Sequence, residues 1–454
     1  MRNFRFWLLA CATASMTCVY SNRVVFGFTV ICQQGGNETG EYIEVDPDYY
    51  LLDTLNLAWM FTSTAIGMCI GPFPFYLAHY LSTRVLILTY GLMSAFSSLL
   101  YPLADSLGFW PALICRFFAG FAQASQLHFT NDFVLRWTPS SEAGFFFSIM
   151  LATSQFGPLF TMILGGEMCS SSFFRWESAY YVLGVLTLLT TFSFAYFYGD
   201  SVEESPFVEE NEKKYILSGK HDVKQKESVP YKSLLSDWTI WISLIMFTGY
   251  YLAMIVYQSY SPIFIKQVLH FTIRQTGYFS AIPQVIAILI KIGGGKLLDH
   301  NFGCSDKTKL TIPLVFLEGF SSLSLFLTGF LDNRVWALVF LMLFASLHFF
   351  VPVICSRTIQ IRAVQHAHFG LNLNMVVAGV AQILIPLGVQ AAVPTNSREE
   401  WSRVFYFLTA SVVATTIAYV FVTKATAASW AKPKPKEEYN IYRLSAEPIE
   451  IKHS

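Results

Sequence analysis

The sequence has few charged residues and no net charge. Only 13% of its 454 residues are Asp, Glu, Lys or Arg, about half the share that is usual in a soluble protein. The 30 basic and 30 acidic residues cancel, so the chain has no global basic field that would hold nucleic acid. Hydrophobic residues make up 54% and aromatic residues 17% of the chain, and this composition predicts an integral membrane protein that does not bind nucleic acid.

Several motifs that mark enzymes and metal sites are also missing. No glycine-rich loop ends in GK[ST], and neither HExxH nor GxSxG occurs, so no ATP motor and no hydrolase is indicated. The eight cysteines form no CxxC pair, which suits neither a zinc site nor a disulfide framework, although Cys32 and Cys169 could meet near one membrane face. We therefore expect no enzyme, no metal site and no cofactor, with any work driven by ion gradients.

Long apolar runs separated by polar breaks dominate the chain. A bilayer core of about 30 Å needs roughly 20 apolar residues in a helix, and we count twelve such spans. They cover approximately 6–32, 54–80, 85–104, 109–135, 143–166, 178–198, 237–261, 277–298, 310–331, 334–356, 367–391 and 403–423. We expect an all-α membrane protein of two six-helix bundles, 1–198 and 237–424. A polar cytoplasmic linker at 199–236, whose Glu and Lys side chains we expect to face solvent, separates them, and a cytoplasmic tail follows at 425–454.

The distribution of Lys and Arg predicts the orientation. Basic residues gather on the side of the termini and the linker, and basic loops stay cytoplasmic, so both termini should be cytoplasmic. The first loop on the other side, 33–50, has acidic residues but no Lys or Arg, and Asn37 begins a glycosylation acceptor triplet there. The first 15 residues also resemble a signal peptide, but the apolar run continues through Ile31.

Two arginines lie deep inside apolar spans. Arg23 is about 14 Å and Arg116 about 10 Å from the outer membrane face by helix rise, so their guanidiniums should reach similar depths. An ionised side chain at such depth costs roughly 2.5 to 3.5 kcal/mol, and no carboxylate of the first half is expected there. Two buried cations without a counterion suit an anion site, because the arginine fork binds carboxylate or phosphate with two hydrogen bonds. In the structural alternative each arginine bonds backbone carbonyls or amide side chains; Gln123, seven residues after Arg116, fits either reading.

Three further ionisable residues share a depth in the second half. Lys291, Glu318 and His348 should each lie about 10 to 12 Å from the inner face. A Lys291–Glu318 pair would offset two insertion costs. His348 titrates near physiological pH, so it is a candidate proton carrier, although a lone membrane histidine is more often a hydrogen-bonded structural residue.

Five stretches resemble one family. They are SNRVVFGFTVIC, CRFFAGFAQ, RWTPSSE, TGYFSAIPQVIAILIKIGGGKLLD and NSREEWSRVFYF. With them the chain resembles the anion:cation symporters of the major facilitator superfamily, the solute carrier group of vesicular glutamate transporters, sialin and sodium/phosphate cotransporters. The resemblance implies two six-helix bundles around a central cavity that opens alternately to either side. It also implies that Arg23 and Arg116 engage the substrate anion, and that Gly294, Gly295 and Asp299 belong to the loop that controls rocking of the bundles.

The chain departs from the family at three positions. Members that carry glutamate have an acidic residue where this chain has Gln123, an arginine where it has Tyr250 and a histidine where it has Phe61. The glutamate-specific and proton-coupling set is therefore broken, and neither substrate nor coupling ion can be transferred.

These observations lead to two functional hypotheses. The first is a symporter for an organic or inorganic anion, driven by co-transported Na⁺ or H⁺, with Arg23 and Arg116 holding the anion. Gln123, Tyr250 and Gln258 would shape its selectivity. The second is a transporter-like protein that no longer transports and instead senses anions or binds partners. In either case we expect a monomer in the lipid bilayer, in the plasma membrane or in a vesicle or lysosome membrane.

Overall fold

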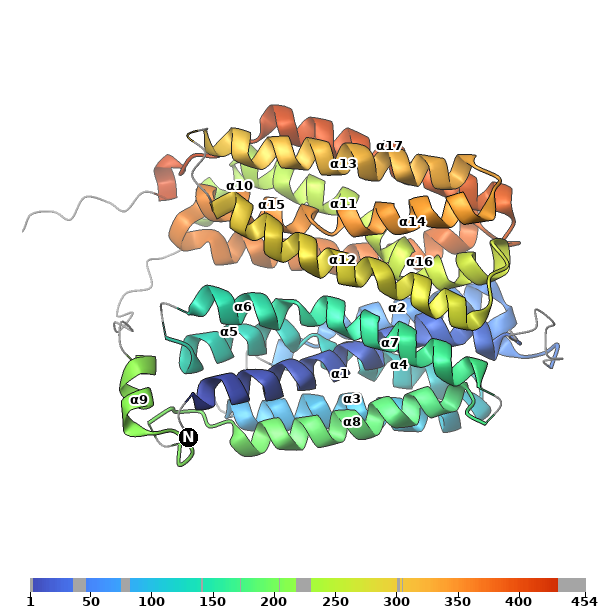
Figure 1. Ribbon diagram of the computed structural model, residues 1–454, viewed down its shortest axis with the longest axis horizontal. Helices are drawn as coiled ribbons and strands as arrows, with labels where there is room; N and C mark the ends of the chain where they lie inside the picture. The colour runs from blue at the N-terminus through green and yellow to red at the C-terminus, as the bar shows by residue number, and fades with distance from the viewer. Residues whose placement is uncertain are drawn as a thin grey trace, which may run out of the picture.

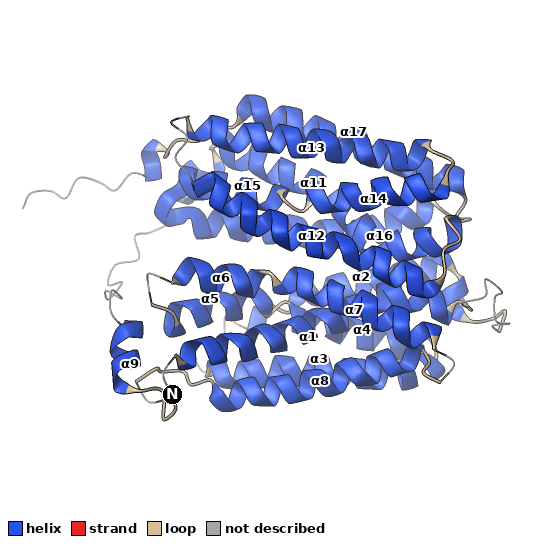
Figure 2. Cartoon of the chain, in the orientation of Figure 1, coloured by secondary structure: helices blue, strands red, loops and turns tan. Residues whose placement is uncertain are grey.

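The computed structural model describes residues 3–35, 46–74, 82–139, 142–171, 173–203, 205–217, 230–299, 303 and 305–431. Helices make up nearly all of this part of the chain, and no strand occurs within it (Figure 2). The helices of the first half are α1 (Phe4–Gln33), α2 (Thr54–Ile70), α3 (Thr83–Ser106), α4 (Phe109–Gln123), α5 (Gln126–Trp137), α6 (Ala143–Leu151), α7 (Thr153–Ser170) and α8 (Trp176–Phe197). Two short helices follow, α9 (Glu210–Leu217) and α10 (Tyr231–Leu235). The second half holds α11 (Trp238–Ile263), α12 (Ile273–Asp299), α13 (Asp306–Phe330), α14 (Arg334–His348), α15 (Val351–Ala363), α16 (Ala367–Ala392) and α17 (Arg398–Val422).

The helices form two bundles, stacked in Figure 1 with α1 to α8 below and α11 to α17 above. In the first bundle α2 packs on α4, α3 on α8, and α1 on α7 and α8; in the second α13 packs on α14 and α17, and α11 on α16 and α17. Across the interface α7 contacts α12, α2 contacts α16, and α1 contacts α11. The described helices match the twelve predicted spans, with α4 and α5, α6 and α7, and α14 and α15 each forming one span in two segments.

Sequence features explain where the helices begin. Asp53, Asp237 and Asn333 accept hydrogen bonds from the backbone N–H groups of the first turns of α2, α11 and α14. Ser397 and Glu400 form a reciprocal capping box at the start of α17. Because these side chains satisfy backbone donors that have no partner inside the helix, each fixes the point at which a span begins.

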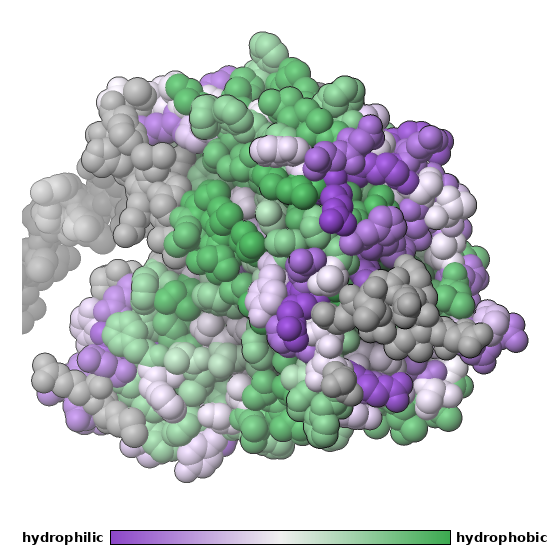
Figure 3. Space-filling view, turned by 45° about the vertical axis from the view of Figure 1, so that its right-hand side comes forward, coloured by the Kyte–Doolittle hydropathy of each residue, from purple (hydrophilic) through white to green (hydrophobic). Residues whose placement is uncertain are grey.

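Hydrophobic residues cover much of the sides of both bundles, as a lipid-facing surface requires, while hydrophilic residues gather toward the right of the view (Figure 3). Exposed tryptophans mark the two rims of the lipid-facing surface. Trp7 near the start of α1 and Trp238 at the start of α11 lie on one side, and Trp110 in α4 and Trp336 in α14 lie on the other. Tryptophan is enriched at membrane interfaces, so these positions delimit the membrane layer. By length and apolar composition alone, seven helices of the described residues qualify as spans, and Thr54–Ile70 and Val376–Ala392 are shorter apolar helices.

We name the two ends of the molecule by their residues. The N-terminal face is the end where α1 begins at Phe4, and the disulfide face is the end where Cys32, in the last turn of α1, is bonded to Cys169 of α7. The Cα atoms of the two cysteines are 6.2 Å apart. Both helices belong to the first bundle, so the bond fixes the disulfide face of that bundle.

At the N-terminal face the linker is bound to the first bundle. Glu212 of α9 accepts hydrogen bonds from the backbone N–H groups of Phe4 and Arg5, at 3.0 and 3.2 Å, and from Nη1 of Arg5 at 3.0 Å. Arg5 also binds both carboxylate oxygens of Glu142, at 2.9 and 3.1 Å. The expectation that the charged linker side chains face solvent is therefore wrong for Glu212, which is buried because it caps the first turn of α1.

A second ionic cluster occupies the same face of the second bundle. Asp237, which precedes α11, accepts hydrogen bonds from Arg362 of α15 at 2.7 to 2.8 Å and from the indole N–H of Trp430 at 3.3 Å. The start of the first helix is thus joined to Glu142, directly before the fifth span, in the first bundle, and to Arg362, at the end of the fourth span, in the second. Acid and base are exchanged between the halves. The residues around 423–431 lie against the second cluster, just as α9 lies against the first.

Candidate functional site

Arg23 lies at the interface of the two bundles. Its Nη1 donates to Oε1 of Gln382 in α16 at 2.8 Å and contacts the sulfur of Met68 in α2 at 3.4 Å. Its Nη2 donates to the hydroxyl of Tyr20 at 3.1 Å. Nε is buried without a partner among the described residues. Because Tyr20 precedes Arg23 by three residues, both lie on one face of α1, while Gln382 comes from the other bundle.

Arg116 lies directly beside Arg23. Its Nη2 donates to the backbone carbonyl oxygen of Arg23 at 2.8 Å, and its guanidinium carbon is 4.8 Å from the ring centroid of Phe26. The side chain is 2% exposed, and its Nε has no partner among the described residues. The structure thus brings together the two arginines for which the sequence predicts similar depths.

Among the described residues the two guanidiniums contact only neutral groups. Arg23 contacts an amide, a hydroxyl and a thioether, and Arg116 contacts a carbonyl and an aromatic ring. Within the described part of the chain no carboxylate lies within ion-pair distance of either one. Neutral dipoles solvate a guanidinium without cancelling its charge, so the pair keeps two positive charges in a layer where charge is costly.

In the described part of the chain, no hydrogen bond joins the other three predicted substrate residues to either guanidinium. Gln123 donates from Nε2 to Gln126 at 2.8 Å instead of reaching Arg116, and its Oε1 is buried without a partner in the described residues. Tyr250 is buried in the second bundle. Gln258 borders a small cavity beside α1, with Val24 on the facing wall.

His348 forms a buried pair with Glu318. Nδ1 of His348, at the end of α14, is 2.9 Å from Oε2 of Glu318 in α13, and Nε2 is 3.3 Å from the carbonyl oxygen of Tyr250 in α11. Glu318 and His348 are 1% and 0% exposed. The expected Lys291–Glu318 pair is therefore wrong: the carboxylate faces α14, and Nζ of Lys291 lies 5.5 Å from the ring centroid of Phe349.

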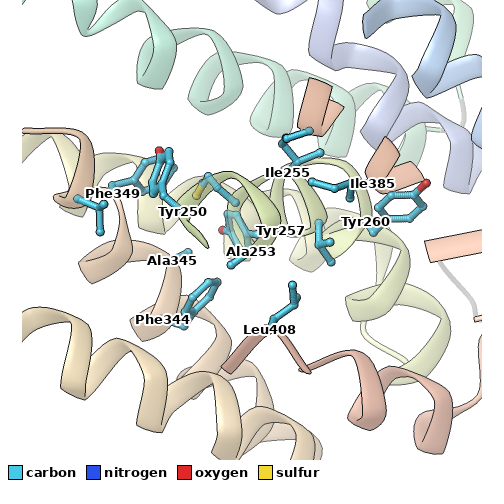
Figure 4. Close-up of a cluster of buried hydrophobic side chains, with 14 of the residues drawn as sticks. Tyr250, Ala253, Ile255, Tyr257, Tyr260, Phe344, Ala345, Phe349, Ile385 and Leu408 are labelled. Carbon is cyan, nitrogen blue, oxygen red and sulfur yellow. The ribbon is translucent and has the colours of Figure 1, made fainter. Parts of the chain in front are cut away.

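The surroundings of this pair are aromatic. The imidazole stacks between Tyr250 and Phe344, with ring centroids 5.0 Å away on each side. Figure 4 shows this aromatic setting along α11 and α14, with Tyr250, Phe344 and Phe349 labelled.

The bundles are joined at the disulfide face. Glu167 of α7 accepts a hydrogen bond from the hydroxyl of Tyr278 in α12 at 2.8 Å and lies 3.4 Å from Nε of Arg274. Nearby, the backbones of Gly166 and Gly277 approach so closely that a Cβ atom on Gly277 would lie 3.0 Å from the Cα atom of Gly166. The side chains of Gln34 and Gln267 add a hydrogen bond of 3.1 Å. This face of the interface is therefore closed.

Two groups of predicted residues fall wholly or partly outside what the structure describes. Asn37, the acceptor asparagine, lies outside the described residues. The structure describes the backbone at Gly294, Gly295 and Asp299, in the last turns of α12, but not their surroundings.

Comparison with known proteins identifies the family to which this chain belongs. A family model described as Major Facilitator Superfamily matches residues 12–386. The chain belongs to the major facilitator superfamily. It is 24% identical to sialin of Homo sapiens over 395 residues, which cover 84% of this chain and 78% of sialin. It is 22% identical to sodium-dependent phosphate transport protein 1 of Mus musculus over 355 residues, covering 75% and 74%. It is 24% identical to the probable small intestine urate exporter of Homo sapiens over 379 residues, covering 82% and 76%.

Solved structures confirm the fold. A D-xylose-proton symporter matches with a TM-score of 0.68 at 13% identity, over 92% of this chain and 98% of that one. A bacterial homolog to the human lysosomal transporter Spinster, in an inward-facing and occupied conformation, matches with a TM-score of 0.62 at 12% identity, over 92% and 96%. The expected family, fold and class of membrane transporter, as opposed to enzyme, are thus confirmed, and the curated relatives named above are transporters or exporters of the expected group.

The sequence reasoning missed the partners of Arg23. Tyr20 could have been found, because a spacing of three residues places it on the same helix face as Arg23. Gln382 and Met68 could not, because only the packing of α16 and α2 against α1 brings them to the guanidinium.

Proposed function

We propose that this protein is a secondary active transporter that moves a small organic or inorganic anion across a membrane by alternating access, driven by a sodium or proton gradient. The observation that carries the proposal is the contact between Arg23 and Arg116 in the absence of a described carboxylate partner. A bound anion would supply the charge that the protein does not, and the two-pronged guanidinium suits a carboxylate or phosphate group.

The position of Gln382 links anion binding to movement. Arg23 belongs to the first bundle and Gln382 to the second, and they are joined by a hydrogen bond of 2.8 Å. An anion that binds Arg23 competes with this bond or bridges it, so its affinity depends on how the bundles are placed. Differential affinity for two arrangements is what a ligand needs in order to shift a conformational equilibrium. Midplane sites at repeat interfaces are the usual arrangement in secondary transporters.

The substrate class follows from the same contacts and from the relatives. Their names refer to phosphate and urate, and a site of two arginines with neutral hydrogen-bonding neighbours suits any such small anion. We place the protein in the plasma membrane or in a vesicle or lysosome membrane as a monomer. The N-terminal face is assigned to the cytoplasm, because basic residues gather there and because disulfides persist in oxidising, non-cytosolic compartments.

Isosteric substitution gives the sharpest test of the anion site. Gln382→Glu would place a carboxylate on Arg23 without changing shape, and loss of anion binding by roughly ten- to hundredfold is expected from a new charged hydrogen bond. Arg23→Ala and Arg116→Ala should abolish uptake into proteoliposomes, and Arg116→Lys should be poor because lysine lacks the planar fork. Arg175→Ala, at an exposed arginine paired with Glu177, is the matched control. Full uptake by correctly inserted Arg116→Ala and Gln382→Glu variants would refute the site.

The Glu318–His348 pair is the candidate for proton coupling. Carboxyl and imidazole groups can both bind and release a proton, both side chains are buried, and His348 touches the backbone of α11 at Tyr250. His348→Gln keeps hydrogen-bonding groups but cannot carry the proton, so it should make uptake insensitive to an imposed pH gradient while substrate binding persists. If uptake by the wild-type protein requires sodium and ignores pH, proton coupling at this pair is excluded.

A non-transporting anion sensor is the alternative, and one observation favours it. The positions that carry the glutamate-specific set in the family hold Tyr250, which stacks on His348, and Phe61, which packs on Phe26 and Tyr260. Phosphate, urate, glutamate and sialic acid, tested with sodium and proton gradients applied separately, would decide between the two. Anion binding with no flux under any gradient would establish the sensor.

A further inference from the structure

A small cavity lies between the bundles, close to Arg23 but on another side of α1. Val24 of α1 and Pro158 and Met162 of α7 form an apolar wall from the first bundle. The volume is about 10 Å³, which is enough for one water-sized occupant and too small for an organic anion.

The second bundle supplies the polar wall. Ser280 and Gln284 of α12 line the cavity from one helix face, because they are four residues apart. Both side chains are 2% exposed, and Ser280 Oγ and Gln284 Oε1 are buried without any hydrogen-bond partner among the described residues. A buried polar group without a partner costs about 1 to 3 kcal/mol, so two such atoms at one cavity indicate a missing occupant.

Helix α11 adds further oxygen atoms. Gln258 and Ser261 line the same cavity. Pro262 lies inside α11 and has no N–H, so the carbonyl oxygen of Gln258 lacks its usual partner four residues later. This oxygen faces α1, since a Cβ atom on Gly27 would lie 3.6 Å from it.

The chemistry of the wall selects the occupant. Three side-chain oxygens at the cavity are buried without a partner among the described residues, the hydroxyls of Tyr257 and Ser280 and the amide oxygen of Gln284, and no charged side chain lines it. Each of these oxygens, like the Gln258 carbonyl, has lone pairs that can bind a cation. Oxygen-only ligand sets suit hard cations, and carbonyl groups released at helix irregularities coordinate Na⁺ in other transporters. We propose that this cavity binds a sodium ion, held by Ser280, Gln284 and the Gln258 carbonyl.

The position explains how such an ion would act. Val24 at the cavity directly follows Arg23, so a sodium ion here would lie next to the anion site, on a wall made by both bundles. The attraction between the two ions would make each bind more tightly in the presence of the other. This coupling rests on the proposed anion transport, but binding of sodium to the cavity does not require it.

Thermal stability of the purified full-length protein tests the site without transport. Because a ligand that binds only the folded state stabilises it, NaCl should raise the unfolding midpoint by a few degrees relative to KCl and choline chloride at equal ionic strength. Ser280→Ala and Gln284→Leu should each remove the sodium-specific shift. Gln284→Glu, which adds a carboxylate ligand, should instead enlarge it. Ser324→Ala is the matched control, because Ser324 is equally buried and donates to the carbonyl of Phe320 in its own helix.

Each outcome decides the matter. A sodium shift that is lost in the cavity variants and kept in Ser324→Ala supports the site. A shift that persists in Ser280→Ala and Gln284→Leu, or none in either the wild-type protein or Gln284→Glu, overturns it and leaves a water molecule as the occupant. Failure here is distinct from failure of the anion site, because the effects of Arg116→Ala and Gln382→Glu on anion binding are measured without sodium.

Discussion

Replacing Gly277 should hold the transporter open at the disulfide face. A Cβ atom at this position would lie 2.6 Å from the carbonyl oxygen of Met162 and 3.0 Å from the Cα atom of Gly166, both backbone atoms of α7. Ordinary contacts are 3.4 Å or longer, so in Gly277→Ala the two helices must separate by several tenths of an ångström. Overpacking of this kind costs about 1 to 3 kcal/mol.

The cost falls on one conformation only. In the alternating-access cycle proposed above, α7 and α12, which belong to different bundles, touch when the disulfide face is closed and separate when it opens. A penalty of about 1 to 3 kcal/mol therefore shifts the equilibrium roughly 5- to 150-fold toward the open arrangement. Uptake should fall because the closed state becomes rare, while expression and folding of each bundle should be retained.

A distance measurement separates this effect from misfolding. Spin labels at positions 171 and 272, which lie just outside α7 and α12 on the disulfide face, should report a longer and broader distance in Gly277→Ala than in the parent. Gly388→Ala in α16 is the control, since a Cβ atom there meets no other atom within 4 Å. An unchanged label distance together with normal uptake in Gly277→Ala would refute the reasoning.

Three other substitutions have different expected results. Glu142→Gln removes the ion pair with Arg5, whose hydrogen bonds hold the pKa of the Glu142 carboxyl below its ordinary value of about 4.5. The ion pair therefore stabilises the protein above that pH, and this stabilisation is lost as the pH falls through the lowered pKa. The difference in unfolding midpoint between the variant and the wild type should shrink on acidification. Gly120→Ala should prevent folding of the first bundle, because its Cβ atom would lie 1.9 Å from a backbone oxygen of α2. Size-exclusion chromatography of this variant, fused to a fluorescent protein, should show aggregate. Cys169→Ser should lower the unfolding midpoint but leave uptake intact, since both bonded helices lie in one bundle; loss of uptake would show that the bond also acts on the movement between bundles.

Much of the fold could be predicted from the sequence because the membrane imposes one dominant constraint. Any segment that crosses the bilayer must satisfy its own backbone hydrogen bonds and present apolar side chains, so apolar runs predicted where the spans lie. Some ends were wrong: the second span was expected to reach residue 80 but α2 ends at Ile70, and the tenth was expected to end at residue 356 but α15 ends at Ala363. The same constraint drew attention to Arg23 and Arg116, because charged residues inside apolar spans are costly and rare. The similar depth of the two arginines followed from helix rise, because sequence position determines depth in the membrane, but their contact also needs α1 to pack on α4.

Lateral packing was not predictable in the same way. Depth placed Lys291, Glu318 and His348 at one level, but it did not say which helices are neighbours there, and Glu318 pairs with His348 because α13 packs on α14. The interruption of the fourth span, just after Gln123, was also missed, because a helix break without glycine or proline at the break leaves no mark in hydropathy. The interruption of the tenth span, just after His348, does have such a mark, since Pro352 lies in the first turn of α15. Gln382 was missed for the related reason that its partner belongs to the other bundle.

The hydrogen bonds between Glu212 and the first turn of α1 determine how much of the linker is left to join the two bundles. The chain is fixed to the first bundle as far as Leu217 and joins the second at Tyr231. The stretch between these anchors can reach at most about 50 Å when fully extended. This length limits how far Leu217 and Tyr231 can move apart, so deleting residues between them should restrict how far the two bundles can separate at the N-terminal face.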